Sequence, residues 1–452
     1  MSQITTQHGI LERLFKLSQK NTTVKTEILA GLTTFVAMGY IIFVNPNILA
    51  ESGIPKEAAI AATIWSTVLA SSLMGLWANF PVAVAPGMGL NAFFTYTVVL
   101  GMGLPWQTAL GAVFISGIVF LLLTLGGIRQ AIINAVPMNL KSAIGVGIGT
   151  FIAFVGLQGS GLVVDNPATL VGAGHVAGID FVMGQPAPLL TLIGLIFTGV
   201  MMARGVSCAL LLGIAFTTVL GMICGATAAP TGLADIVSTE LPSLSETFLA
   251  MDLMAAFAYG IVSIIFTFTV VELFDNMGTL IGVTRKAGLM HEDGKIDNLD
   301  RALTTDAIGT MGSAALGTST VTSYVESAAG IAAGGRTGLT AVTVAALFAV
   351  SLLFAPLVGL VPAFATAPAL IIVGALMMAE VVHIRFDDIT DAIPAFLTII
   401  MMPLTYSIAN GFAFGFTSYV LLKLGAGRFK EVNWVMGLIG LVFMINFAIR
   451  LH

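Results

Sequence analysis

Fourteen apolar stretches follow one another along the chain, separated by short polar connections. A helix needs about 20 residues to cross a hydrocarbon core, and these stretches meet or approach that length. They lie at 27–44, 57–78, 81–101, 107–126, 139–157, 187–203, 206–227, 253–283, 300–316, 318–335, 337–360, 366–382, 392–408 and 411–424. For a further run, 434–449, the pattern leaves open a crossing, a re-entrant piece and an interfacial helix. The pattern predicts an all-α integral membrane protein of about 14 spans.

Two of these stretches are interrupted by residues that do not belong in an apolar helix. Pro81–Phe94 (PVAVAPGMGLNAFF) and Gly317–Gly330 (GTSTVTSYVESAAG) contain Pro, Gly, small hydroxyls, an amide and a carboxylate. At membrane depth, irregular backbone is tolerated only where it lines a cavity or is buried in protein. Each segment is the third span of its half, so we expect two inverted repeats of seven spans, with broken helix or strand segments in spans 3 and 10.

Composition and charge agree with a membrane protein and orient it. The chain is 57% hydrophobic and only 9% charged, against about 25% charged in soluble domains. With the N-terminus in the cytoplasm, every lysine and arginine except Lys56 and Arg450 falls on the cytoplasmic side, where they are expected. The connections 158–186 and 228–252 on the other side contain neither residue type. No basic stripe suggests a nucleic-acid partner, and the histidines form no metal-binding pattern.

Ionisable groups at membrane depth are the next candidates, because each costs roughly 2.5–3.5 kcal/mol or more at a helix centre. Glu272 and Asp275 lie three residues apart in the eighth span, and Glu326 lies in the second broken segment. Asn91 is the uncharged counterpart of Glu326 in the first segment. Asp306 is expected at the cytoplasmic end of its span, with a structural role.

An amide and two or three carboxylates at two helix breaks suit a neutral, planar, hydrogen-bonding solute. An anion would require Arg or Lys at the midplane, and none is expected there. A carboxyl in an apolar wall can carry a proton, so proton symport follows and no further cofactor is needed. Sodium stays an alternative, bound by a carboxylate and backbone carbonyls. An ion channel and a membrane enzyme are disfavoured, because the chain shows neither a ring of charges nor a nucleophile and base pair.

Motifs along the whole chain resemble those of AzgA-type purine nucleobase permeases, which are relatives of the uracil/xanthine permeases. The motifs are Gly31-Leu-Thr-Thr-Phe35, Val44-Asn-Pro-Asn47, Ala85-Pro-Gly-Met-Gly-Leu-Asn-Ala-Phe-Phe94, Leu104-Pro-Trp-Gln107, Phe274-Asp-Asn-Met-Gly-Thr-Leu280, Lys286-Ala-Gly-Leu289, Gly317-Thr-Ser-Thr-Val-Thr-Ser-Tyr-Val-Glu-Ser327, Gly334-Gly-Arg-Thr-Gly-Leu339 and Met402-Pro-Leu-Thr-Tyr-Ser-Ile408. Together they identify the family more specifically than any one of them alone.

The resemblance implies a core domain that moves like an elevator against a gate domain, and a homodimer formed through the gate. After a cytoplasmic segment, 1–26, the core would comprise 27–126 and 253–360, and the gate 139–227 and 366–452. The resemblance assigns substrate contacts to Asn91, Asp275 and Glu326, with hydroxyls and aromatic rings around them at Thr320, Thr322, Phe35, Phe93, Phe94, Phe274 and Tyr324. Asp275, Glu326 and Glu272 are the candidates for proton coupling, although Glu272 departs from the family pattern as a substrate ligand.

These expectations combine into one reading. The chain is expected to import hypoxanthine, guanine and adenine by proton symport across a bacterial inner membrane. The alternative is a carrier of the same fold with another cargo, either uracil/xanthine or an anion. The carboxylate of Glu326 at the second break disfavours the anion.

Overall fold

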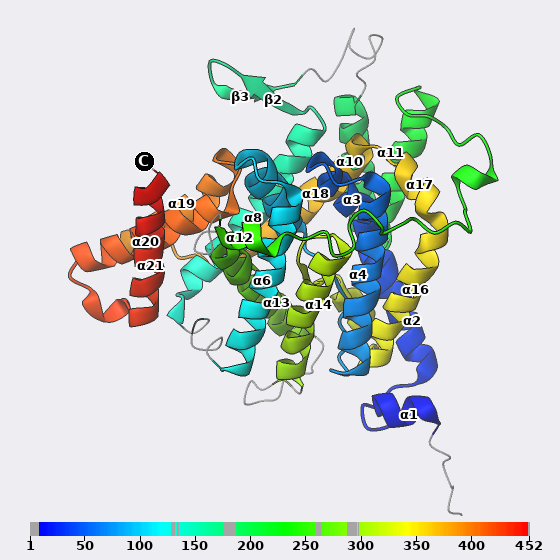
Figure 1. The fold of residues 1–452 in the computed structure, drawn as a ribbon, viewed down its shortest axis with the longest axis horizontal. Helices are drawn as coiled ribbons and strands as arrows, with labels where there is room; N and C mark the ends of the chain where they lie inside the picture. The colour runs from blue at the N-terminus through cyan, green and yellow to red at the C-terminus, as the bar shows by residue number, and fades with distance from the viewer. Residues whose placement is uncertain are drawn as a thin grey trace, which may run out of the picture.

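The computed structural model describes residues 9–127, 132, 135–174, 187–258, 264–286, 296 and 298–450, without the side chains of 277, 278, 281, 285, 286 and 445–450. Helices dominate these ranges, and most of the long ones run roughly alongside one another (Figure 1). The prediction of a mainly helical protein is confirmed.

The two halves of the chain contribute similar series of elements. The first half contains α1 (Ile10–Phe15), α2 (Val24–Met38), α3 (Ile41–Glu51), α4 (Lys56–Leu76), β1 (Val84–Pro86), α5 (Met88–Ala92), the π-helix η1 (Phe93–Gly101), α6 (Trp106–Leu125), α8 (Met138–Gly159), β2 (Val163–Asn166), β3 (Leu170–Ala173), α10 (Ala187–Ala203) and α11 (Ala209–Ile223). The second half contains η2 (Leu233–Asp235), α12 (Leu253–Ala258), α13 (Phe266–Lys286), α14 (Leu299–Leu316), β4 (Val321–Ser323), α15 (Ser327–Ala332), α16 (Gly338–Ser351), η4 (Leu352–Phe354), α17 (Ala355–Leu360), α18 (Ala363–Met377), η5 (Met378–His383), α19 (Ile389–Leu404), α20 (Ile408–Gly425), η6 (Phe429–Glu431) and α21 (Trp434–Arg450).

Six helical stretches among the described residues are long and apolar enough to cross a membrane. They are Val24–Glu51, Lys56–Leu76, Trp106–Leu125, Met138–Gly159, Gly338–Leu360 and Ala363–His383. Five shorter apolar helices accompany them, and the count of fourteen spans stays a prediction. The expected end of the first span at residue 44 is wrong. Helix α3 continues to Glu51 with Pro46 inside it, because the neighbouring Asn45 is buried and hydrogen-bonded rather than solvated.

Glycines let several helices approach each other at backbone distance, as is common in membrane helix pairs. A Cβ atom added to Gly338 of α16 would lie 1.9 Å from the carbonyl oxygen of Gly75 in α4. Between α8 and α18, a Cβ added to Gly374 would lie 2.3 Å from the carbonyl oxygen of Gly149. Helices α8 and α18 each begin directly after a Val-Pro pair, so equivalent positions of the two halves pack on one another.

The fully buried Glu27 ties α2 to the turn between α15 and α16. Its carboxylate accepts the backbone N–H groups of Arg336 (2.9 Å) and Thr337 (3.2 Å) and the hydroxyl of Thr340 (2.6 Å). The guanidinium of Arg336 donates to the carbonyl oxygens of Ile331 and Gly335, both at 2.7 Å. Arg336 therefore caps the end of α15.

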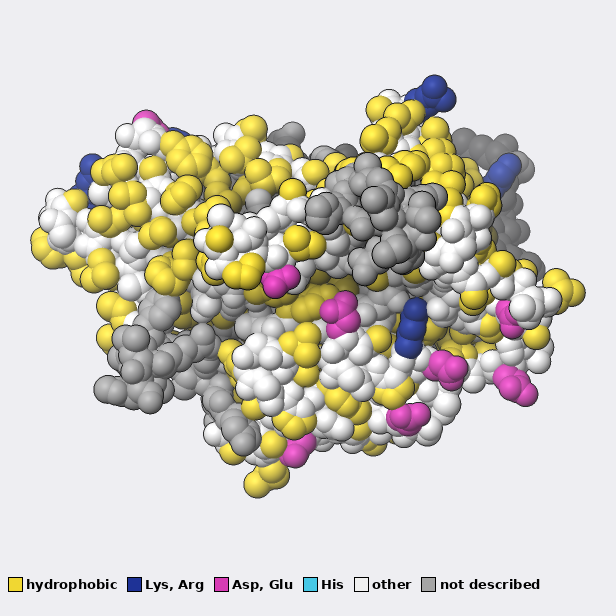
Figure 2. Space-filling view, turned by 90° about the horizontal axis from the view of Figure 1, so that it is seen from above, with side chains coloured by type: hydrophobic (Ala, Val, Ile, Leu, Met, Phe, Trp, Pro, Cys, Tyr) yellow, Lys and Arg dark blue, Asp and Glu magenta, His cyan; other side chains and the backbone are white. Residues whose placement is uncertain are grey.

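One connection that the pattern left without structure contains a hairpin. Strands β2 and β3 pair antiparallel, and the Asn166 side chain accepts the backbone N–H of Ala168 in the turn at 2.9 Å. The short strands lie mostly outside the apolar stretches, so hydrophobic periodicity does not reveal them. Figure 2 views the end of the molecule that carries this hairpin, and acidic side chains are scattered there among apolar ones. The rest of this connection, 175–186, lies outside the described residues.

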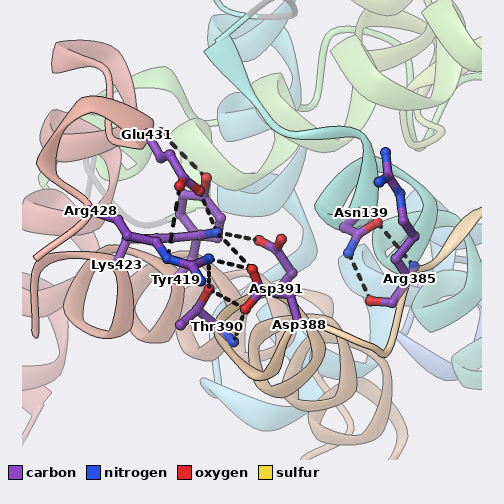
Figure 3. A network of polar contacts seen from close by, with 9 residues as sticks. All are labelled: Asn139, Arg385, Asp388, Thr390, Asp391, Tyr419, Lys423, Arg428 and Glu431. Carbon is purple, nitrogen blue, oxygen red and sulfur yellow. Dashed lines mark hydrogen bonds and ion pairs between the residues drawn. The ribbon is translucent and has the colours of Figure 1, made fainter. Parts of the chain in front are cut away.

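A charged cluster joins the N-terminal end of α19, the C-terminal end of α20 and the short helix η6 (Figure 3). The Lys423 side chain is only 1% exposed and lies 2.6 Å from Glu431 and 3.0 Å from Asp391. Asp388 accepts hydrogen bonds from Arg428 and Thr390, and these hold its pKa well below the ordinary value. The buried ammonium is thus matched by carboxylates, as burial of a charge requires.

The approach of α4 and α16 gives a stability prediction. Gly338→Ala should lower the free energy of unfolding by about 1–3 kcal/mol, because the added methyl group overlaps the Gly75 carbonyl and forces the backbones apart. Thermal unfolding of the detergent-solubilised protein measures this change. Gly199→Ala in α10 is the matched control, since its Cβ meets no atom within 4 Å. Equal midpoints for both variants would contradict the packing argument.

Candidate functional site

The two interrupted segments pair with each other. Strands β1 and β4 run antiparallel with Val84 opposite Ser323, Ala85 opposite Thr322 and Pro86 opposite Val321. The pairing extends at both ends, because Gly87 N–H donates to the Thr320 carbonyl (3.0 Å) and Tyr324 N–H donates to the Ala83 carbonyl (2.9 Å). The two broken segments, one from each half of the chain, therefore meet. This crossing places α5 and α15 directly after the two strands.

Asn91 lies in α5, immediately after the crossing, and is fully buried. Its Nδ2 donates to the side-chain oxygen of Asn45 at 2.8 Å. Its Oδ1 has no hydrogen-bond partner among the described residues. A buried polar atom without a partner costs about 1–3 kcal/mol, so this oxygen is a candidate acceptor for a ligand.

Glu326 follows β4 and precedes α15, on the other side of the crossing. Its carboxylate accepts the hydroxyl of Tyr40 at 2.6 Å. Tyr40 is 1% exposed and lies between α2 and α3. Tyr324 is also buried and donates its hydroxyl to the Pro86 carbonyl at 2.5 Å, which links the two segments through a side chain.

Asp275 of α13 belongs to the same neighbourhood. Its carboxylate interacts with the Thr322 side chain and lies close enough to Glu326 and Tyr324 for direct electrostatic interaction. Among the described residues, no lysine or arginine forms an ion pair with Asp275, Glu326 or Glu272. The structure therefore brings two of the predicted carboxylates together without pairing them to a cation.

Glu272 and Asp306 form a second polar network behind β4. The hydroxyl of Thr310 donates to Glu272 at 2.5 Å, and Ser323 of β4 hydrogen-bonds both Asp306 oxygens at 3.2 Å. Asn276 accepts the backbone N–H of Ser323 at 2.7 Å. The expected place of Asp306 at the cytoplasmic end of its span is wrong. Asp306 is fully buried in α14 against β4, because the Ser323 hydroxyl of that strand hydrogen-bonds its carboxylate.

The predicted aromatic and hydroxyl residues are all buried or half-buried, and two of the rings pack against other phenylalanines. Phe93 packs edge-on against Phe268 (centroids 4.9 Å apart), and Phe35 packs in the same way against Phe348 (5.3 Å). The other phenylalanine candidates are the fully buried Phe94 and the half-buried Phe274. The Thr320 hydroxyl is fully buried and has no partner in the part of the chain that the structure describes.

Sequence reasoning missed Tyr40, Asn45 and Asn276, which hold the candidate groups in place. Asn45 sits in the Val44-Asn-Pro-Asn47 motif, where two amides inside an apolar span were an available signal. Tyr40 carries no comparable signal, because tyrosine is common in membrane proteins near the interfaces. The assembled site contains an amide, several hydroxyls and carboxylates. It can hydrogen-bond an uncharged solute at several points, and it would repel an anion.

Comparison with known proteins agrees with this chemistry. The model of the "Permease family" matches residues 25–414. The chain is 42% identical to the adenine permease AdeP of Escherichia coli, over 98% of this chain and 97% of that protein. It is 45% identical to the guanine/hypoxanthine permease PbuG of Bacillus subtilis, over 97% and 99%. The transmembrane domain of the cyanobacterial bicarbonate transporter BicA has the same fold, with a TM-score of 0.64 at 15% identity, covering 85% of this chain and 97% of that one.

Proposed function

This chain belongs to the permease family and groups with its AzgA-type nucleobase permeases, and we propose that it imports purine nucleobases by proton symport. Hypoxanthine, guanine and adenine are the proposed cargo, because full-length relatives are permeases for these bases. The observation that carries the proposal is the pairing of β1 with β4, which brings the unpartnered Asn91 oxygen and the Glu326 carboxylate to the two sides of one crossing.

The chemistry of this site supports a purine over the other cargoes that the fold accommodates. A purine is neutral and planar, and it offers ring N–H and exocyclic N–H donors that carboxylate and amide oxygens accept. An anion would meet Glu326 and Asp275 with no lysine or arginine paired to either among the described residues. Uracil or xanthine is the nearer alternative, and competition for labelled hypoxanthine uptake separates these cargoes.

We assign the proton to the carboxylates of the core, the half-buried Asp275 ahead of the half-buried Glu326 and the fully buried Glu272. Glu326 already accepts the Tyr40 hydroxyl and serves the substrate best as an ionised acceptor. Asp275 lies within electrostatic reach of Glu326, so the charge state of each affects the other. Sodium stays the alternative coupling ion. No separate cofactor takes part in the proposed cycle.

We further propose that the core (27–126 and 253–360) carries the site past the gate (139–227 and 366–452) in a homodimer of the bacterial inner membrane, with the N-terminus in the cytoplasm. The packing supports this division. Helices α2, α4 and α16 pack together, α6 packs on α14, and α8 packs on α18 and α19. A contact between the two proposed domains is visible where Tyr96 of η1 packs edge-on against Tyr406, with centroids 5.1 Å apart.

Glu326→Gln should weaken purine binding at least tenfold, because a charge-assisted hydrogen bond to the base contributes about 1.5–3 kcal/mol. Calorimetric binding of hypoxanthine to the detergent-solubilised protein measures the loss. Glu380→Gln, at an exposed position of η5, is the control with the same chemical change and should bind like the wild type. Wild-type affinity in a folded Glu326→Gln variant would remove Glu326 from the site.

Uptake should rise as the external pH falls from about 8 to about 6, since external protons then load the carboxyl that carries them. It should collapse with a protonophore and be unchanged when choline replaces sodium. Asp275→Asn should keep purine binding within tenfold but lose accumulation against a gradient, leaving exchange alone. Asp165→Asn, exposed on β2, should accumulate normally. A sodium requirement, or accumulation by Asp275→Asn, would overturn the assignment.

Cross-linking across the proposed domain boundary should stop transport. In a background with Cys208 and Cys224 replaced by serine, cysteines at Tyr96 and Tyr406 should react with a short bifunctional thiol reagent and block uptake, because the elevator must separate them. Cysteines at Asn139 and Arg385 provide the control within the gate, where the two residues exchange hydrogen bonds of 3.0 and 3.1 Å. Uptake that survives the first cross-link would rule out the elevator.

A further inference from the structure

The orientation of the Asn91 amide is dictated by a residue outside the proposed set of substrate contacts. That residue is Asn45 of α3, which is fully buried. Its amide group has two N–H donors and one oxygen acceptor to place. Which of these faces Asn91 depends on what the other partners of Asn45 can accept.

The partners of Asn45 leave it one arrangement. The Thr63 hydroxyl donates to the Ala59 carbonyl at 2.6 Å, so it can only accept the N–H of Asn45 that lies 2.8 Å away. The second N–H of Asn45 reaches the hydroxyl oxygen of Thr318 at 3.0 Å. Both donors of Asn45 are then used, and its oxygen is the group left for Asn91.

Asn91 must therefore donate to Asn45, as it does at 2.8 Å, and its own oxygen faces away from that bond. This oxygen is the fully buried atom that has no partner among the described residues. The relay joins three parts of the structure: Thr63 on α4, Thr318 at the start of the second broken segment, and Asn91 within the first. Residues from both halves of the chain thus determine which end of the Asn91 amide faces Asn45.

We propose that Asn45 is a positioning residue that sets substrate specificity by holding Asn91 as a hydrogen-bond acceptor. The inference rests on the proposed function. It adds that the base must present an N–H donor of its six-membered ring, from a ring nitrogen or an exocyclic amino group, to the Asn91 oxygen. A base with a carbonyl oxygen or a bare ring nitrogen at that point leaves two acceptors facing each other, and such mismatches at a site built for hydrogen bonding are rejected strongly.

Adenine, hypoxanthine, guanine and xanthine form the test panel, because they exchange amino for oxo groups at the 6- and 2-positions of the ring. Calorimetry gives their Kd values for wild type and variants. Two bases that differ at the position facing the Asn91 oxygen should have different Kd values. The wild-type protein should bind the base with an N–H donor at that position at least tenfold more tightly than the base with an acceptor there. Asn45→Leu should reduce that preference to less than about threefold, since the Asn91 amide can then turn to present either group.

Three further variants separate positioning from general damage. Asn45→Asp keeps an oxygen facing Asn91 and should retain the wild-type preference once the Thr63 and Thr318 hydroxyls turn to donate to its second oxygen. Thr318→Val removes one acceptor from the relay and should reduce the preference. Asn47→Leu, in the same motif but outside the relay, should leave the preference unchanged. Thr318→Val also gives the readout if Asn45→Leu fails to fold.

Two results would overturn the inference. One is an equal loss for all four bases in Asn45→Leu and Thr318→Val, which marks a structural role alone. The other is a wild type that binds purines but shows no tenfold donor preference. A wild type that binds none of the four bases would refute the proposed function itself, and the inference with it.

Discussion

Backbone hydrogen bonding at membrane depth is the constraint on which this structure depends. Each unsatisfied N–H or C=O group in a hydrocarbon core costs several kcal/mol, so an interrupted helix needs partners for the groups that the break exposes. Here the two breaks satisfy each other through β1 and β4, and Ser71 and Ser327 supply further hydrogen bonds to Val84 and Ala83. Because neither segment is satisfied alone, the crossing also fixes the relation of the two halves.

The polar groups around the crossing follow from the same constraint. A buried carboxylate or amide needs hydrogen-bond partners, and the short strands leave room for side chains that provide them. Glu326 is held by Tyr40, Asp306 by Ser323, and Asn91 by Asn45. The atoms left without partners in the described residues, such as Asn91 Oδ1 and Thr320 Oγ1, therefore stand out as places for a ligand.

Sequence reasoning located the two breaks and the rare ionisable residues, because hydropathy makes polar residues in apolar stretches conspicuous. It could not find the partners of those residues. Asn45 and Asn91 are 46 positions apart, and Tyr40 and Glu326 are 286 apart, so only the packing of helices brings them together. The position of Asp306 was mispredicted for the same reason. Its charge suggested a place at the membrane surface, but the Ser323 hydroxyl hydrogen-bonds its carboxylate inside the protein. The hairpin β2–β3 was not predicted, because its strands are short and largely exposed.

The contacts that hold the candidate site and the contacts to the proposed gate involve different residues. Asn91 and Glu326 are held by Asn45 and Tyr40, both within the proposed core. The Thr97 hydroxyl donates to the Tyr406 carbonyl of the gate at 3.0 Å, and α5, which carries Asn91, packs on α8 of the gate through apolar contacts. Tyr406 has a φ of 53°, an uncommon conformation for a bulky residue that costs of order 1–3 kcal/mol. The contact at the domain boundary can therefore break while the hydrogen bonds that orient the site stay intact. A site that moves as a rigid unit requires this independence of the two sets of contacts.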